Sequence, residues 1–358
     1  MKLGKSLVEL ATEVTRQNAS KRDFLADTRT LAMSVNPSTE GLHNEPILTV
    51  GSSQLAIRPT AHGQIGTHAG IPKAYYDKML AEAPNLLASN VNHWLQATPE
   101  KRMVRTLDGA VRGFLSSRYR AMDNFDLLQS VLPVLQGRNV EFKSCEVTEK
   151  HLYLKVIFPE LRTEVPGSRQ VGDIIEAGLS IRNSEIGFSS FAVEPFFHRL
   201  VCTNGMISNY AQRKYHVGKR LDSENAVEEI LRDETRDVRD RAFWMQIQDV
   251  VASAINRDVL NAHVTKFAEA AKIKIEADPV AVIEMARKQF QLTEGQGSDI
   301  LKHLIEGGDL SKWGLANAVT RTAEDQLDYE DATGLERLGG KIIELSPQDW
   351  KSLAVKVA

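Results

Sequence analysis

The sequence predicts an α+β fold, in which a central, mostly antiparallel sheet lies between N-terminal helices and a helical C-terminal region. Alternating β-rich runs are concentrated in residues 103–206 and are absent after Leu221. Short turns join these runs, and strands joined by short turns pair antiparallel because parallel strands need long crossovers. We therefore expect an N-terminal helical segment over residues 1–46, an α+β core over 47–220 and a helical region over 221–358.

The first third of the chain alternates helical and β-type patterns. Residues 3–33 predict helices, because apolar side chains recur there at helical spacing. Residues 36–46 are rich in Pro, Ser, Gly and Asn and predict a loop. Two β-rich runs around Gly51 predict a hairpin over residues 47–59. Helical patterns then resume over residues 60–95.

The centre of the chain carries the clearest strand signals. Asp108-Gly109 is a strong two-residue hairpin turn between β-rich runs. Residues 125–136 predict an amphipathic helix, and residues 140–160 predict a second strand pair by their alternation. Two or three further strands follow, and Asn204-Gly205 predicts a type I′ turn near the last of them. These strands supply the sheet of the predicted core.

The C-terminal region reads as helix throughout. Residues 223–255 lack Gly and Pro and keep helical periodicity, which predicts one long helix. Asp278-Pro279 and Ser346-Pro347 each combine an N-cap residue with proline at the first helical position. Gly307-Gly308 and Gly339-Gly340 mark breaks between helices.

The composition of the 358 residues is that of an ordinary globular protein, with 42% hydrophobic and 25% charged residues. No apolar run reaches the roughly 18 residues that span a membrane. Two cysteines, Cys145 and Cys202, fit a reducing compartment and predict structural thiols. We expect a cytoplasmic protein with no membrane partner.

The net charge of −3 is unevenly distributed along the chain. Residues 221–358 carry 26 acids and 17 Lys or Arg, a balance of −9, which leaves +6 for residues 1–220. A basic front with an acidic back is an electrostatic pattern that suits a polyanion. The alternative is that these opposite charges neutralise each other within the fold.

Two acid-poor stretches, residues 195–220 and 101–120, combine cations with interleaved tyrosines. Cations pair with phosphates and aromatic rings stack on bases, so the pattern predicts binding to nucleic acid, in particular single-stranded DNA. The candidate contacts are Arg112, Arg118, Arg120, Arg199, Tyr210, Arg213, Lys214 and Tyr215. We expect them to converge on one face of a protein that forms homo-oligomers. The alternative is that these arginines pair with the acidic C-terminal helices.

Motifs for catalysis are absent from the sequence, so no catalytic residue, metal or cofactor is predicted. There is no classical phosphate loop, no dinucleotide fingerprint, no HExxH and no CxxC. A Cys202–His198 pair is conceivable as a thiol and its base, but cysteine is more often a small core residue. Two other functions stay open: a modulator that binds a host protein, and a metal-dependent nuclease. The acids considered for the nuclease are Asp173, Glu176, Glu185 and Glu194.

Three stretches, residues 113–128, 179–206 and 313–325, resemble a phage- and plasmid-associated family catalogued as domain of unknown function 932. They match its Ser-x-x-Tyr-x-x-x-Asp-Asn, Asn-Ser-Glu-x-Gly, Arg-Leu-x-Cys-x-Asn-Gly-Met and Asn-Ala-Val-Thr-Arg blocks. The resemblance covers most of the chain and implies a mobile-element context, without established catalytic residues. An accessory role in strand annealing or replication is the function that we expect.

Overall fold

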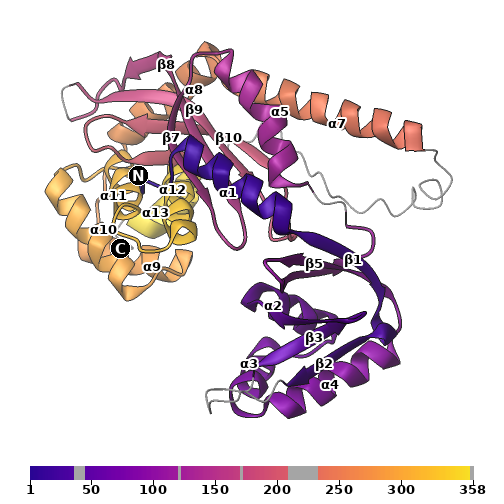
Figure 1. Ribbon diagram of the computed structural model, residues 1–358. Helices are drawn as coiled ribbons and strands as arrows, with labels where there is room; N and C mark the ends of the chain where they lie inside the picture. Colours follow the sequence, from indigo (N-terminus) through magenta and orange to yellow (C-terminus); the bar gives the residue numbers. More distant parts are fainter. Residues whose placement is uncertain (36–44, 120–121, 170–171, 209–232, 355–358) are drawn as a thin grey trace.

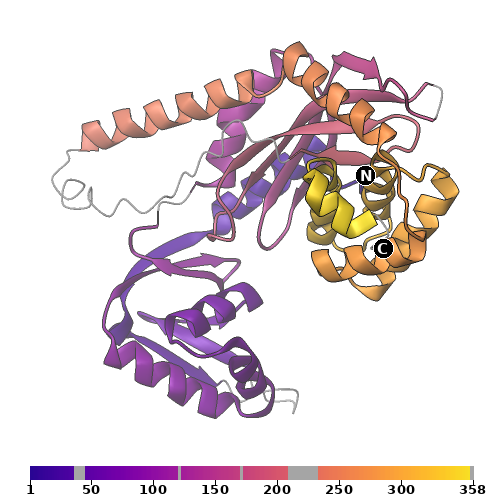
Figure 2. The same cartoon turned by 180° about the vertical axis from the view of Figure 1, so that it is seen from behind.

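The computed structural model describes residues 1–35, 45–119, 122–169, 172–208 and 233–354. They form two lobes, each built on its own sheet, and a set of C-terminal helices that packs on the larger lobe (Figures 1 and 2). The predicted α+β class with a helical C-terminal region is confirmed. None of the helices in these ranges is both long and apolar enough to cross a membrane.

The N-terminal lobe holds a six-stranded sheet with strand order β1-β5-β6-β4-β3-β2. Its strands are β1 (Arg22–Asp27), β2 (Leu31–Val35), β3 (Pro46–Val50), β4 (Ser53–Ile57), β5 (Lys101–Leu107) and β6 (Ala110–Ser116). All neighbours pair antiparallel except β4 and β6, which form a short parallel pair. The helices of this lobe are α2 (Pro59–His68), α3 (Lys73–Glu82) and α4 (Pro84–Ala97).

The prediction of helix over residues 3–33 is wrong beyond Ser20. Helix α1 (Leu7–Ser20) begins at a capping box and is followed by β1 and β2. Strand β1 pairs with β5, and β2 pairs with β3, so long-range pairing overrides the local periodicity. In β2 the side chains of Leu31 and Met33 are buried and those of Ala32 and Ser34 are exposed, which is the period of a strand.

Both predicted hairpins of this lobe are confirmed. Strands β3 and β4 form the first, and β5 and β6 form the second. In the second hairpin Asp108 and Gly109 both have positive φ, 53° and 74°, as a type I′ turn requires.

The larger lobe holds a five-stranded antiparallel sheet with strand order β11-β10-β9-β8-β7. The strands are β7 (Glu141–Val147), β8 (Leu152–Glu164), β9 (Ile174–Asn183), β10 (Ala192–Arg199) and β11 (Gly205–Ile207). Helix α5 (Asn124–Gln136) packs against α1 and α7 (Asp233–Ser253) beside this sheet (Figure 1). The long helix expected over residues 223–255 is present from Asp233, and its earlier part lies outside the described residues.

The remaining helices form the C-terminal region. They are α8 (Arg257–Lys272), α9 (Pro279–Phe290), α10 (Glu294–Gly307), α11 (Lys312–Thr322), α12 (Tyr329–Ile343) and α13 (Pro347–Ala354). Helix α12 packs closely on β11, because a Cβ added at Gly340 would lie only 2.1 Å from the carbonyl oxygen of Ile207. Glycine at this position therefore sets the distance between helix and sheet.

A buried charged layer joins β8 and β10 to α12. The ammonium of Lys155 lies 2.5 Å from a carboxylate oxygen of Glu336, and both side chains are fully buried. Beside this pair, Arg337 donates to Glu194 over 2.6 Å. Burial lowers the pKa of Lys155, and the neighbouring Glu336 opposes that effect.

Candidate anion-binding site

Three of the eight candidate nucleic-acid contacts lie within the described residues, and they lie in different environments. Arg118 is exposed after the end of β6, whereas Arg112 and Arg199 are buried. The other five, Arg120, Tyr210, Arg213, Lys214 and Tyr215, lie outside the described residues.

Arg112 lies at the junction between the two lobes and not on an open face. Its guanidinium is 2.7 Å from the carboxylate of Glu185. Arg105 on the neighbouring strand is fully buried and contacts Asp23 at 2.9 Å and Asp123 at 2.6 Å. We therefore withdraw Arg112 as a phosphate contact. Its partner, Glu185, belongs to the predicted α+β core. The alternative that this arginine pairs with the acidic C-terminal helices therefore does not hold for Arg112.

Two of the sequence blocks meet at this junction. The side-chain amide of Asn183 donates to the side chain of Asn124 over 2.8 Å, and the hydroxyl of Tyr119 donates to the carbonyl of Ser184 over 3.0 Å. The backbone N–H of Asn124 donates to Glu185 over 2.7 Å. The Ser-x-x-Tyr-x-x-x-Asp-Asn and Asn-Ser-Glu-x-Gly blocks therefore build the contact between the lobes.

The other two blocks meet at a cavity of about 440 Å³. Residues from the β8–β9 connection, the β10–β11 connection and helices α10 and α11 line it. Arg169, Arg199 and Arg321 all contribute to its wall, together with Cys202 and Asn317. Of the described candidates, Arg199 lines this cavity.

Arg199 is held in the cavity wall by a carboxylate. Its guanidinium donates two hydrogen bonds to the fully buried Asp173, over 2.5 and 2.8 Å, and lies 5.7 Å from the ring centroid of Trp313. Burial alone would raise the pKa of Asp173, but hydrogen bonds from Arg199 and Ser168 outweigh burial and lower it. We therefore correct the role of Arg199: it orders the wall, and its charge is already compensated.

Arg321 and Arg169 differ from Arg199 in having no carboxylate partner among the described residues. Arg321 is half-buried, and the exposed Arg169 donates to the carbonyl of Gly308. The two acids in the cavity wall face other basic side chains: Asp309 faces Lys274 at 3.9 Å, and Glu306 faces His303 at 3.4 Å. Three guanidinium groups and two carboxylates therefore line the described wall, and two of the guanidinium groups have no described carboxylate partner, which favours an anionic ligand.

Asn204 organises the same wall from within, and the predicted type I′ turn at Asn204-Gly205 is wrong. The residue with positive φ is Thr203, at 53°, and Gly205 already belongs to β11. The buried side chain of Asn204 donates to Asn317 over 3.1 Å and to Thr320 over 2.5 Å. These bonds join the Arg-Leu-x-Cys-x-Asn-Gly-Met and Asn-Ala-Val-Thr-Arg blocks.

The two cysteines occupy different sites. Cys145 is buried, and burial raises its pKa to about 12. Cys202 is half-buried at the cavity, where a guanidinium nitrogen of Arg199 donates to its sulfur over 3.5 Å. His198, the base considered for Cys202, contacts Glu176 at 3.3 Å. Cys145 is the core residue that we expected, whereas Cys202 belongs to the cavity.

Thiol labelling should distinguish the two cysteines. Because only a thiolate reacts, Cys145 should resist an aromatic disulfide reagent at pH 8 in the native protein, and Cys202 should react. We expect about one fast equivalent per chain and none in Cys202→Ser. Two fast equivalents, or a fast equivalent that persists in Cys202→Ser, would contradict this assignment.

The four acids considered for a nuclease centre each contact a basic side chain, which for Glu176 is a histidine whose pKa is lowered by burial. Asp173 faces Arg199, Glu176 faces His198, Glu185 faces Arg112 and Glu194 faces Arg337. These pairs are distributed over both the lobe junction and the larger lobe. Within the described ranges, no group of three or more His, Cys, Asp or Glu residues could hold a metal ion.

Sequence reasoning missed Arg169 and Arg321. Glu324 and Asp325 follow Arg321 at helical spacing, which would predict ion pairs with it. In the structure Glu324 contacts the amino group of Met1, and Asp325 contacts His303 at 2.8 Å. Because both acids have these distant partners, neither neutralises Arg321, and its charge faces the cavity.

Comparisons of the chain with known protein families, with curated proteins and with solved structures find no match.

Proposed function

We propose that this protein binds nucleic acid and that the cavity receives a backbone phosphate of a single strand. The observation that carries the proposal is the pair of guanidinium groups, Arg169 and Arg321, which share one cavity without described carboxylate partners. The guanidinium presents a rigid fork of donors that matches the oxygens of a phosphate. Arg321 is half-buried, and a phosphate contact with it is screened less by salt than a contact at an open surface.

A single strand suits this site better than a duplex. The charged groups line a concave cavity of about 440 Å³, with Asn317 as a further polar group. A flexible strand can bend one phosphate into such a cavity, whereas duplex DNA is stiff over about 150 base pairs. A strand-annealing or replication accessory role in a phage or plasmid is the context that the family resemblance supports.

Charge reversal at the cavity should weaken DNA binding. We expect the double variant Arg169→Glu/Arg321→Glu to bind a fluorescent oligothymidine at least tenfold more weakly than wild type at low salt. Each lost phosphate contact should also reduce the salt slope of log K by roughly 0.7. Fluorescence anisotropy across ionic strength measures both quantities.

A matched control reverses an exposed cation elsewhere. Lys78→Glu in α3 replaces a cation with an anion, as each cavity substitution does. Lys78 lies in the N-terminal lobe, and its side chain is 66% exposed. It should leave affinity within about twofold of wild type. If the cavity double variant binds as tightly as the wild type, the proposed function is wrong.

A further inference from the structure

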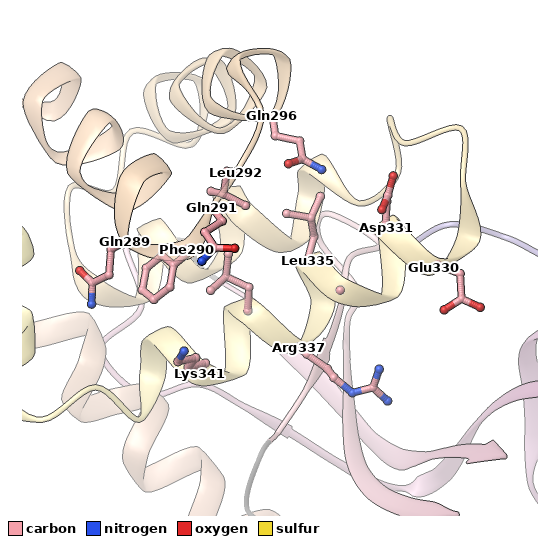
Figure 3. Close-up of a pocket in the computed structure, with 12 residues that line it drawn as sticks. Gln289, Phe290, Gln291, Leu292, Gln296, Glu330, Asp331, Leu335, Arg337 and Lys341 are labelled. Atoms are coloured by element: carbon pink, nitrogen blue, oxygen red, sulfur yellow. The ribbon is translucent and has the colours of Figure 1, made fainter. Parts of the chain in front are cut away.

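A second cavity, of about 510 Å³, lies where the end of α9 and the start of α10 face α12 (Figure 3). Its floor is apolar and is formed by Phe290, Leu292, Leu335 and Leu338. Phe290, Leu292 and Leu338 are only partly buried, so their apolar atoms remain accessible. Side-chain amides of Gln289, Gln291 and Gln296 add hydrogen-bonding groups around this floor.

The two ends of this cavity carry opposite charges. Figure 3 shows Asp331 at one end and Lys341 at the other, with Leu335 between them. In the described part of the chain neither charge has an ion-pair partner. Lys341 lies 5.3 Å from the centroid of the Phe290 ring, which holds the ammonium beside the apolar floor. A ligand that fits must present a cation, an apolar group and an anion in that order.

The spacing of the charges indicates the length of the ligand. Asp331 and Lys341 lie on one helix, where each residue rises about 1.5 Å, so their backbones are roughly 15 Å apart. An extended peptide rises about 3.3 Å per residue and covers that distance with about five residues. We propose that this cavity docks an extended peptide segment of a partner protein, with a basic residue, a central Leu or Phe and an acidic residue at alternate positions.

A peptide fits these groups better than a nucleic acid does. The carboxylate of Asp331 at one end would repel phosphates, whereas the apolar floor suits an aliphatic or aromatic side chain. Peptide backbone groups also find partners in the glutamine amides. The proposal adds a protein partner to the nucleic acid of the first cavity and does not depend on it.

Gly334 leaves the cavity unobstructed, which is consistent with a binding site. It lies in the middle of α12 and lines the cavity, and a Cβ added there would meet no atom within 4 Å. Glycine inside a helix lowers stability by about 1 kcal/mol relative to alanine. Packing does not require glycine at this position, but an unobstructed cavity does.

The first test compares three pentapeptides that carry fluorescein on the N-terminal amine and an amide at the C-terminus. Their sequences are Lys-Ser-Leu-Ser-Glu, Lys-Ser-Leu-Ser-Lys and Glu-Ser-Leu-Ser-Glu. Fluorescence anisotropy should give an affinity for the first peptide at least fivefold above that for either peptide with like charges. Equal affinities within twofold for all three peptides would overturn the proposal, as would efficient displacement of the first peptide by oligothymidine.

Two variants of the whole chain make the test specific. Gly334→Leu fills the cavity and should abolish peptide binding, whereas Gly63→Leu in α2, where an added Cβ also meets nothing within 4 Å, should bind as wild type does. Asp331→Lys, an exposed change, should switch the preference to the peptide with two glutamates. Wild-type affinity in Gly334→Leu, or an unchanged preference in Asp331→Lys, would refute docking at this site.

Discussion

Replacing Glu336 with Gln should lower the free energy of unfolding by about 3–5 kcal/mol, because it leaves a buried ammonium without its counter-charge. Lys155 and Glu336 are both fully buried between β8 and α12, where water cannot solvate the remaining charge. Urea denaturation at pH 7, followed by tryptophan fluorescence and circular dichroism, measures the change.

The double variant Lys155→Met/Glu336→Leu is the control for this prediction. It removes both charges and keeps apolar volume, and buried ion pairs replaced in this way are often as stable as the original. We expect it to recover most of the stability that Glu336→Gln loses. A loss below about 1 kcal/mol in the single variant would show that Lys155 is neutralised without its partner.

Arg105→Met should have a similarly large effect, together with a change in how the two lobes unfold. Arg105 contacts Asp23 in its own lobe and reaches Asp123 and the carbonyl of Glu185 in the other. Its loss leaves the buried carbonyl of Glu185 without a donor and removes a fully buried guanidinium from the half-buried Asp123, at a cost of about 3–5 kcal/mol. We expect calorimetry to show one main transition in the wild type and two in the variant.

Arg102→Met on the same strand serves as the comparison for Arg105→Met. Arg102 pairs with Glu100 and lies over the ring of Phe114, so its contacts stay within the N-terminal lobe. It should lower stability less and keep a single main transition. If Arg105→Met also unfolds in one transition with little loss of stability, the arginine does not couple the lobes.

Local signals were sufficient for the two hairpins of the N-terminal lobe and for most helices of this chain. Asp108-Gly109 forms its predicted turn, because two adjacent residues determine that geometry. Strand β1 was missed because its partner β5 lies far along the sequence, and only that pairing selects strand over helix. The local sequence therefore predicts this turn and the helix caps, whereas the edge strand β1 can be predicted only when its distant partner strand is known.

The candidate site was less accessible to sequence reasoning. Acid-poor composition predicted Arg112 and Arg199 as phosphate contacts, but the fold brings an acid from elsewhere in the chain to each of them, Glu185 to Arg112 and Asp173 to Arg199. Arg321 shows the reverse case, since its neighbouring acids contact other groups. Whether an arginine is available to a ligand depends on which acids the fold brings to it, and sequence spacing does not give this.

The junction between the lobes also has a consequence for biosynthesis. All six strands of the first sheet lie before residue 117, whereas Glu185, the partner of Arg112, follows much later. At roughly 5–20 residues per second, a ribosome needs on the order of several seconds to add the intervening chain. During that interval the N-terminal lobe can fold with Arg105 paired to Asp23 and with Arg112 presented to water. Like charge on this face would discourage nascent chains of one polysome from associating before the second lobe is complete.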